Sequence, residues 1–171
     1  PKAYTGVKLV REGALALSGD AGIGEIRDLV LGGDLGDPPG GGQVEATDWM
    51  PDEYRAKLVK FIEMHGNSEL MGVLPEREWI LRAPTLQRKL ALTAKVQDEV
   101  GHAQLIYRVV EDLGKPRARC LDDLVNGTAK FHNVFHYPTK TWADIGIIAW
   151  LVDAAAIVAQ QALRDSSYAP Y

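Results

Sequence analysis

The strongest constraint on the fold is a set of acidic side chains that lie inside apolar helical stripes. Three stretches repeat apolar residues at alternating steps of three and four, which is the spacing of one helix face. They cover about residues 51–74, 84–114 and 141–159. Each stretch places one acid where this spacing expects an apolar side chain: Glu69, Glu99 and Asp153. An unpaired buried carboxylate is costly, so each of these acids needs a partner.

A shared metal ion would satisfy all three acids at once. Glu99 and His102 stand at positions i and i+3, so one helical turn points both side chains the same way. Di-iron sites in helical bundles use this pattern: two helices each give a Glu, and two others each give Glu-x-x-His. The sequence therefore predicts a metal site formed by Glu69, Glu99, His102 and Asp153. The alternatives are that Glu99 and His102 form a surface pair with Glu69 at the rim, and that Asp153 is hydrogen-bonded to a neighbouring helix.

The other histidines give weaker signals. His65 lies on the same stripe as Glu69, and we expect it to support a ligand or to belong to the core. His132 and His136 have the H-x3-H spacing of some zinc sites. No cysteine accompanies them and the stretch looks extended, so we do not expect them to bind metal.

Proline and capping residues set the expected helix limits. The first helix should begin at Pro51 and end just before Pro75. The second should run over residues 84–114, and the third should begin at Thr141, which forms a capping-box pattern with Asp144. These limits predict an all-α fold.

The third helix is almost entirely apolar or small from residue 145 to residue 159, with Asp153 as the exception. A stretch of 15 residues is too short for a bilayer span, which needs about 20. We therefore expect this helix to be buried on most sides.

Residues 1–46 differ from the rest and are predicted to be an irregular N-terminal segment. The run of Gly, Asp and Pro at 32–42 cannot hold a helix or a central strand and reads as a linker. Short strands over 7–31, or a short helix near 25–31, are both compatible with the weak periodicity there. The helical domain occupies residues 47–171, with a short helix expected near 121–125.

Composition excludes several classes of function. Hydrophobic residues make up 46% and charged residues 25%, as in soluble globular proteins. A net charge of −4 gives no reason to expect nucleic acid or a membrane as a partner. The single cysteine, Cys120, excludes an internal disulfide and fits a reducing compartment. With no export signal at the start of the sequence, a cytoplasmic location is expected.

Several long motifs resemble the catalytic subunits of the phenylacetyl-CoA epoxidase family. They include Asp-Trp-Met-Pro-Asp-Glu-Tyr-Arg at 48–55, Asn-Ser-Glu-Leu-Met-Gly-Val-Leu-Pro-Glu at 67–76 and Lys-Val-Gln-Asp-Glu-Val-Gly-His at 95–102. The likeness continues through Trp-Leu-Val-Asp-Ala-Ala-Ala-Ile at 150–157 and covers about residues 47–171.

This resemblance implies a ferritin-like bundle whose di-iron centre uses O2 to epoxidise the ring of phenylacetyl-CoA. The matching positions would make Glu69, Glu99, His102 and Asp153 the iron ligands. The positions implied to contact coenzyme A are Lys60, Lys130, Phe131, His132 and Asn133, and the last two depart from the family pattern. The implied partners are a structural ferritin-like subunit of the C type and a reductase that passes on electrons from reduced nicotinamide.

The family continues past the position of Tyr171 into a fourth bundle helix with a second Glu-x-x-His. That helix is not in this sequence, so the bundle is expected to be incomplete, either because the chain is a fragment or because another chain supplies the helix. Two other functions stay open at this point. The chain could be a non-catalytic structural subunit, or two copies could build a symmetric site across a two-fold axis. In each case the apolar third helix predicts an oligomer.

Overall fold

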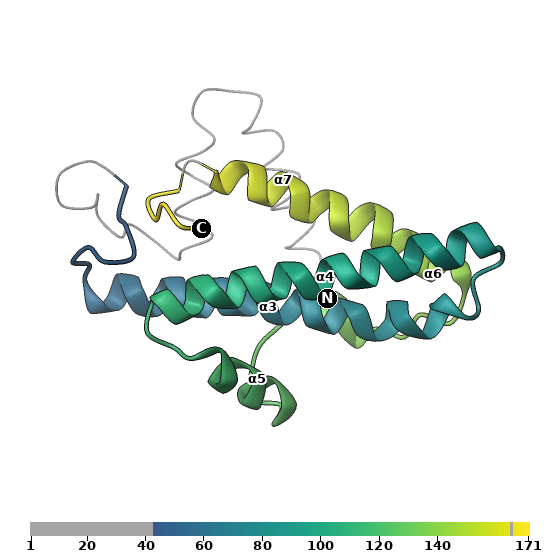
Figure 1. Ribbon diagram of the computed structural model, residues 1–171, viewed down its shortest axis with the longest axis horizontal. Coiled ribbons are helices and arrows are strands. Elements are labelled where there is room, and N and C mark those ends of the chain that lie inside the picture. The colour runs from purple at the N-terminus through teal and green to yellow at the C-terminus, as the bar shows by residue number, and fades with distance from the viewer. Residues whose placement is uncertain (1–42, 165) are drawn as a thin grey trace, which may run out of the picture.

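The computed structural model describes residues 43–164 and 166–171, and this part of the chain is helical (Figure 1). In chain order the elements are α3 (Asp52–Ile80), α4 (Leu86–Asp112), α5 (Arg117–Val125), the 3₁₀ turn η1 (Asn133–His136), α6 (Trp142–Ile147), the π-helical turn η2 (Ile148–Val152) and α7 (Asp153–Leu163). No strand occurs among these residues, where Val44 and Tyr168 form one isolated parallel bridge. The prediction of an all-α bundle is confirmed.

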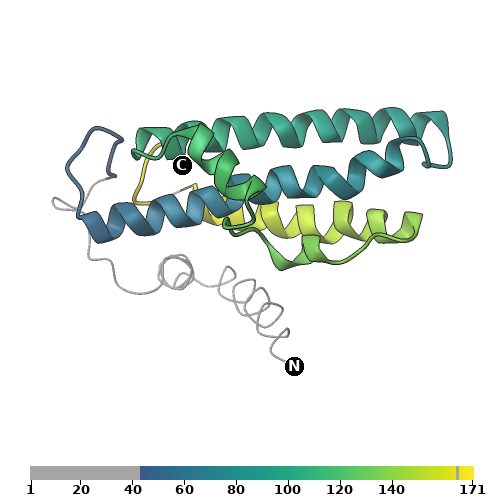
Figure 2. The same ribbon diagram turned by 90° about the horizontal axis from the view of Figure 1, so that it is seen from below.

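The long helices α3 and α4 form an antiparallel pair, and α6, η2 and α7 make one continuous rod beside it (Figures 1 and 2). This rod runs antiparallel to α3. The short helix α5 lies on the other side of the pair (Figure 1). The fold therefore contains three long helical segments of a bundle: α3, α4 and the rod of α6, η2 and α7.

Side-chain caps fix two helix starts where the sequence predicted them. The Thr85 hydroxyl accepts a hydrogen bond from the Arg88 amide at the start of α4. At the start of α6, Thr141 and Asp144 form the predicted capping box, with both side-chain to backbone bonds present.

The prediction that Pro75 ends the first helix is wrong. Helix α3 continues through Pro75 to Ile80. Proline removes one backbone hydrogen bond, but packing beyond it compensates. The buried Trp79 donates from its indole nitrogen to the Thr139 carbonyl at 3.1 Å and packs against Trp142. Tertiary contacts therefore hold the last turn in place.

The expectation that the third helix is short and buried on most sides is also wrong for this chain. The turn η2 joins α6 to α7, so the segment Trp142–Gln161 has 20 residues with a mean hydropathy of 1.8, long and apolar enough to cross a membrane. Several of its large side chains are exposed: Trp150 by 74%, Ile157 by 55% and Leu151 by 53%. The described residues cover only the face toward α3 and α4.

Two apolar clusters lie at opposite ends of the α3–α4 pair. The larger one gathers Leu58 and Ile62 with Tyr107 and Val110, and the chain end joins it through Tyr168. The smaller one joins Trp79, Leu92 and Ile145. Charged side chains fill the region between the clusters, and this is where the acids of the helical stripes lie. The predictions for residues 1–42 fall outside the described residues.

The close approach of α3 to α4 depends on Gly66. A Cβ atom there would lie 2.8 Å from Cε1 of Tyr107, whose ring is fully buried and whose hydroxyl donates to Asn67 at 2.5 Å. We expect Gly66→Ala to lower the free energy of unfolding by about 1–3 kcal/mol, because the ring has no room to move. Urea unfolding followed by circular dichroism measures this change.

The matched control is Gly101→Ala on α4, where an added Cβ meets nothing within 4 Å. Alanine loses less conformational entropy on folding than glycine does. This variant should therefore be as stable as the wild type or more stable by about 0.5–1 kcal/mol. Equal shifts for the two variants would contradict the packing described here.

Candidate metal centre

Three of the four predicted ligands meet midway along the α3–α4 pair. Glu69 comes from α3, and Glu99 and His102 come from one turn of α4. Nδ1 of His102 lies 3.3 Å from Oε2 of Glu99 and 3.5 Å from Oε2 of Glu69. One ligand atom from each of the three residues lies within 4.8 Å of the other two. Among the described residues this is the one group of three or more such side chains close enough to share an ion.

The fourth predicted ligand, Asp153, lies beside the same cavity as Glu69 and Glu99, but its carboxylate contacts a lysine. Oδ2 of Asp153 lies 3.1 Å from Nζ of Lys95. The same ammonium group pairs with Oε1 of Glu76 at 2.8 Å and also with Glu99. Lys95 thus links acids from α3, α4 and the start of α7, and Asp153 is joined to Glu99 through it.

The site has more carboxylates than cations. Glu76, Glu99 and Asp153 share the single Lys95, and the fourth acid, Glu69, lies beside two imidazoles from α3 and α4. Glu76 is only 1% exposed, and its Oε2 atom has no hydrogen-bond partner among the described residues. A buried region with this excess of negative charge favours a cation.

Glu69 and Glu99 differ in acidity. Burial and a hydrogen bond with Glu69 raise the pKa of Glu99 to about 7, although Lys95 opposes the shift. Burial also acts on Glu69, but hydrogen bonds with His65 and Glu99 outweigh it and lower its pKa to about 2. Of the two carboxyl groups, Glu99 is therefore the first to take up a proton as the pH falls.

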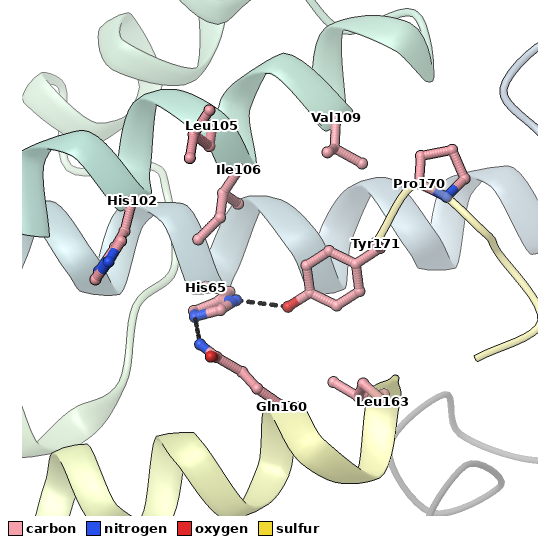
Figure 3. Close-up of a pocket in the computed structure, with 9 residues that line it drawn as sticks. All are labelled: His65, His102, Leu105, Ile106, Val109, Gln160, Leu163, Pro170 and Tyr171. Carbon is pink, nitrogen blue, oxygen red and sulfur yellow. Dashed lines mark hydrogen bonds between the residues drawn. The ribbon is translucent and has the colours of Figure 1, made fainter. Parts of the chain in front are cut away.

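His65 takes the supporting position that was one of its two predicted roles. Its Nε2 atom lies 3.0 Å from Oε1 of Glu69, and its Nδ1 atom lies 2.5 Å from the hydroxyl of Tyr171 (Figure 3). The side chain of Gln160 on α7 also reaches Nε2, at 3.0 Å. These contacts fix the ring and so orient the carboxylate of Glu69.

Two cavities adjoin His65, and they differ in character. The first is an open groove of about 290 Å³, which Figure 3 shows between α4, α7 and the chain end. His65 and His102 line it together with apolar side chains such as Leu105 and Leu163. The second, of about 70 Å³, is the metal-side cavity. It is lined by Glu69, Glu76, Lys95, Glu99 and Asp153, and by Ser68, His132, Phe135 and Val152.

A third cavity, of about 270 Å³, lies on the neighbouring face of α3. Its lining includes three lysines, Lys60, Lys115 and Lys130. We call it the lysine cavity. Lys115 is engaged within the protein, because its ammonium group contacts both oxygens of Glu63 at 2.7 Å and Asp123 at 2.9 Å. Neither Lys60 nor Lys130 forms an ion pair with another residue in the described part of the chain.

Three of the five residues implied to contact coenzyme A line these cavities, and Phe131 and Asn133 do not. Lys60 and Lys130 line the lysine cavity, whereas His132 lines the metal-side cavity. The ring of Phe131 packs on that of His136 at 4.6 Å between centroids. Asn133 is exposed at the start of η1.

Sequence reasoning missed Lys95 and Glu76. Glu76 follows Glu69 at seven residues and so continues the same helix face, but the assumed stop at Pro75 placed it outside the helix. Lys95 precedes Glu99 by four residues, which is the spacing of an intrahelical ion pair. Both signals were present in the sequence.

Comparison with known proteins shows the family to which this chain belongs. The chain matches the phenylacetic acid catabolic protein family over residues 26–171. It belongs to that family. The A-type subunit of 1,2-phenylacetyl-CoA epoxidase from Escherichia coli strain K12 is 52% identical over 128 residues, which cover 75% of this chain and 41% of that relative.

Membership of the phenylacetic acid catabolic family confirms both the resemblance found in the sequence and the ferritin-like fold. The match begins at residue 26, inside the segment that the sequence analysis set apart. This chain spans less than half the length of its Escherichia coli relative.

The acidity of Glu99 predicts how metal affinity depends on pH. Below pH 7 the carboxyl group of Glu99 holds a proton that a bound cation must displace, because its pKa is about 7. The affinity for Fe(II) should therefore rise with pH up to about pH 7 and level off above it. Anaerobic equilibrium dialysis between pH 5.5 and pH 8.5 measures this curve.

Two variants test the assignment. Glu99→Ala should bind no Fe(II) at this site, whereas Asp98→Ala, which removes an exposed acid one residue earlier, should follow the wild-type curve. Unchanged iron content in Glu99→Ala would refute the ligand assignment.

Proposed function

We propose that this chain is part of the catalytic subunit of a di-iron oxygenase that epoxidises the aromatic ring of phenylacetyl-CoA. The observation that carries this proposal is the meeting of Glu69, Glu99 and His102 within ligand distance, beside the buried carboxylate of Glu76. The name of the Escherichia coli relative supplies the reaction.

The residues present suit iron. Carboxylate and imidazole groups are the donors of di-iron bundles, and the Oε2 atom of Glu76 marks a carboxylate oxygen that no described residue satisfies. Glu69, Glu99 and His102 would hold the metal, and Asp153 would join them once Lys95 releases it. A di-iron centre, when bound, supplies reductive activation of O2.

The side chains around the centre orient its ligands, exclude water and balance its charge. His65 holds Glu69 in position, while Ile148, Val152 and Phe135 give the metal-side cavity apolar walls. Lys95 balances the charge of whichever carboxylates the metal leaves unbound. In the overall reaction one oxygen atom enters the ring and the other leaves as water, with two electrons and two protons consumed.

Coenzyme A, the handle of the substrate, fits the lysine cavity. Its phosphates need cationic partners, and Lys60 and Lys130 line this cavity without an ion pair to any described residue. Binding of a remote handle supplies affinity and brings the reacting ring to the metal.

The remaining parts of the enzyme are proposed from the same family. The three ligands gathered here are too few for two irons, and we infer that a further helix with Glu-x-x-His completes the site. The exposed apolar face of α6, η2 and α7 provides a surface that other helices can cover. As partners we propose a nicotinamide-dependent reductase and a structural ferritin-like subunit, in a cytoplasmic complex.

A second candidate is a non-catalytic structural subunit. The contacts of Lys95 favour it, because one ammonium group already neutralises part of the charge of Glu76, Glu99 and Asp153 without any metal. Iron content of the purified intact protein separates the candidates. About two irons per chain support the oxygenase, about two per dimer support a site shared between copies, and none supports the structural role.

The proposed function predicts a specific effect of Lys60. Replacing Lys60 with Ala should raise the KM for phenylacetyl-CoA about tenfold and leave kcat nearly unchanged, because the lost contact is to the handle and not to the ring. Steady-state assays of epoxide formation in the reconstituted complex measure both constants.

The control is Lys57→Ala, one turn earlier on α3, where the ammonium group pairs with Glu53 at 3.1 Å and lies outside the cavity. Its KM should equal that of the wild type. A wild-type complex that forms no epoxide, or equal KM values for Lys60→Ala and Lys57→Ala, would contradict the proposal.

A further inference from the structure

Two buried polar residues stand directly before the metal ligand Glu69 on α3 and take no part in the metal group. Asn67 is 1% exposed and Ser68 is 4% exposed. Burial of polar side chains is costly unless their hydrogen bonds are made. The partners of these two residues therefore indicate what they do.

Both residues bind the backbone of one non-helical segment, Lys130–His132. The amide nitrogen of Asn67 donates to the Lys130 carbonyl at 2.9 Å. The hydroxyl of Ser68 accepts a hydrogen bond from the His132 amide at 3.0 Å and donates to the Met64 carbonyl at 2.7 Å. The segment has no regular structure of its own, so these bonds hold it against α3.

The orientation of Asn67 is itself fixed from α4. The hydroxyl of Tyr107 donates to Oδ1 of Asn67 at 2.5 Å, and the ring of Tyr107 is fully buried against Gly66. With its oxygen occupied in this way, the amide of Asn67 has its nitrogen toward Lys130. The contact to the segment is therefore set by the packing of the two long helices.

The segment lies between the two cavities. Asn67 and Lys130 line the lysine cavity, and Ser68 and His132 line the metal-side cavity. The next residue of α3, Glu69, belongs to the metal group. Three consecutive residues of one rigid helix therefore connect the lysine cavity, the segment and the metal site.

We propose that Asn67 and Ser68 are positioning residues that fix the segment Lys130–His132, and with it the placement of an acyl-CoA, relative to the metal centre. This inference rests on the proposed function, and it names the residues that couple handle binding to chemistry. A small displacement of a bound substrate can lower the rate strongly, because productive geometry requires close alignment of the reacting atoms. Loosening the segment should therefore lower the amount of epoxide formed per O2 consumed more than it weakens the binding of coenzyme A.

Ser68→Ala tests the proposal in the intact, iron-loaded complex. The change removes the acceptor of the His132 amide and leaves both cavities in place. We expect epoxide formed per O2 consumed, and kcat, to fall about three- to tenfold, as for the loss of one buried hydrogen bond. Iron content and the dissociation constant for free coenzyme A should stay within about twofold of the wild type. This split is the reverse of that expected for Lys60→Ala.

A control variant separates the loss of the hydrogen bond to the His132 amide from the loss of the hydrogen bond that Ser68 donates within α3. Thr93→Ala on α4 removes a hydroxyl that, like that of Ser68, donates to the carbonyl four residues earlier, but Thr93 is exposed and lines none of the three cavities. It should leave the yield of epoxide per O2 unchanged. Hydrogen exchange of the His132 amide gives a second readout, and it should become faster in Ser68→Ala and not in Thr93→Ala.

Tyr107→Phe provides an independent variant if Ser68→Ala does not fold. It removes only the hydroxyl that orients Asn67, and it should lower the yield of epoxide per O2, as Ser68→Ala does. Wild-type yields in the folded variants, or losses that follow iron content in Ser68→Ala and Thr93→Ala alike, would overturn the inference. If the wild-type complex neither binds coenzyme A nor forms epoxide, that result would instead contradict the proposed function, and the inference would fall with it.

Discussion

The structure is organised around carboxylates that are partly or fully buried between helices and need positive charge. Glu69, Glu76, Glu99 and Asp153 come from three helices, and Lys95 is the permanent cation among them. Their ion pairs outweigh the effect of burial and raise the pKa of Lys95, so it stays charged. This polar centre lies between two apolar clusters that hold the ends of the α3–α4 pair. The clusters provide the stability that lets the centre remain charged and buried.

The same arrangement accounts for the surface of the chain. Asp153 directs one face of the rod formed by α6, η2 and α7 toward Lys95, and the opposite face keeps large exposed apolar side chains such as Trp150. The turn η2 ends immediately before Asp153, and π-helical turns are frequent at functional sites. One face of the rod therefore serves the centre, while the other has the composition of an interface.

Much of this could be predicted from the sequence because helical spacing is local. Glu69, Glu99 and His102 stood out since each interrupts an apolar stripe, and the structure brings them together. The contacts of Asp153 could not be foreseen, because they depend on Lys95, whose partners come from three helices. The continuation of α3 past Pro75 was missed for a similar reason, since the anchoring of Trp79 on Thr139 joins residues 60 positions apart. The segment that Asn67 and Ser68 hold has no periodicity from which its placement could be read.

The central claim is that these acids are buried together because they bind iron. The most direct measurement is anomalous diffraction at the iron edge from crystals of the intact protein with its partner subunits, grown with Fe(II) under anaerobic conditions. We predict iron bonded directly to Glu69, Glu99 and His102, with Asp153 turned from Lys95 toward the metal. Anomalous density located elsewhere, or none at all with Lys95 still paired to Glu99 and Asp153, would contradict this prediction.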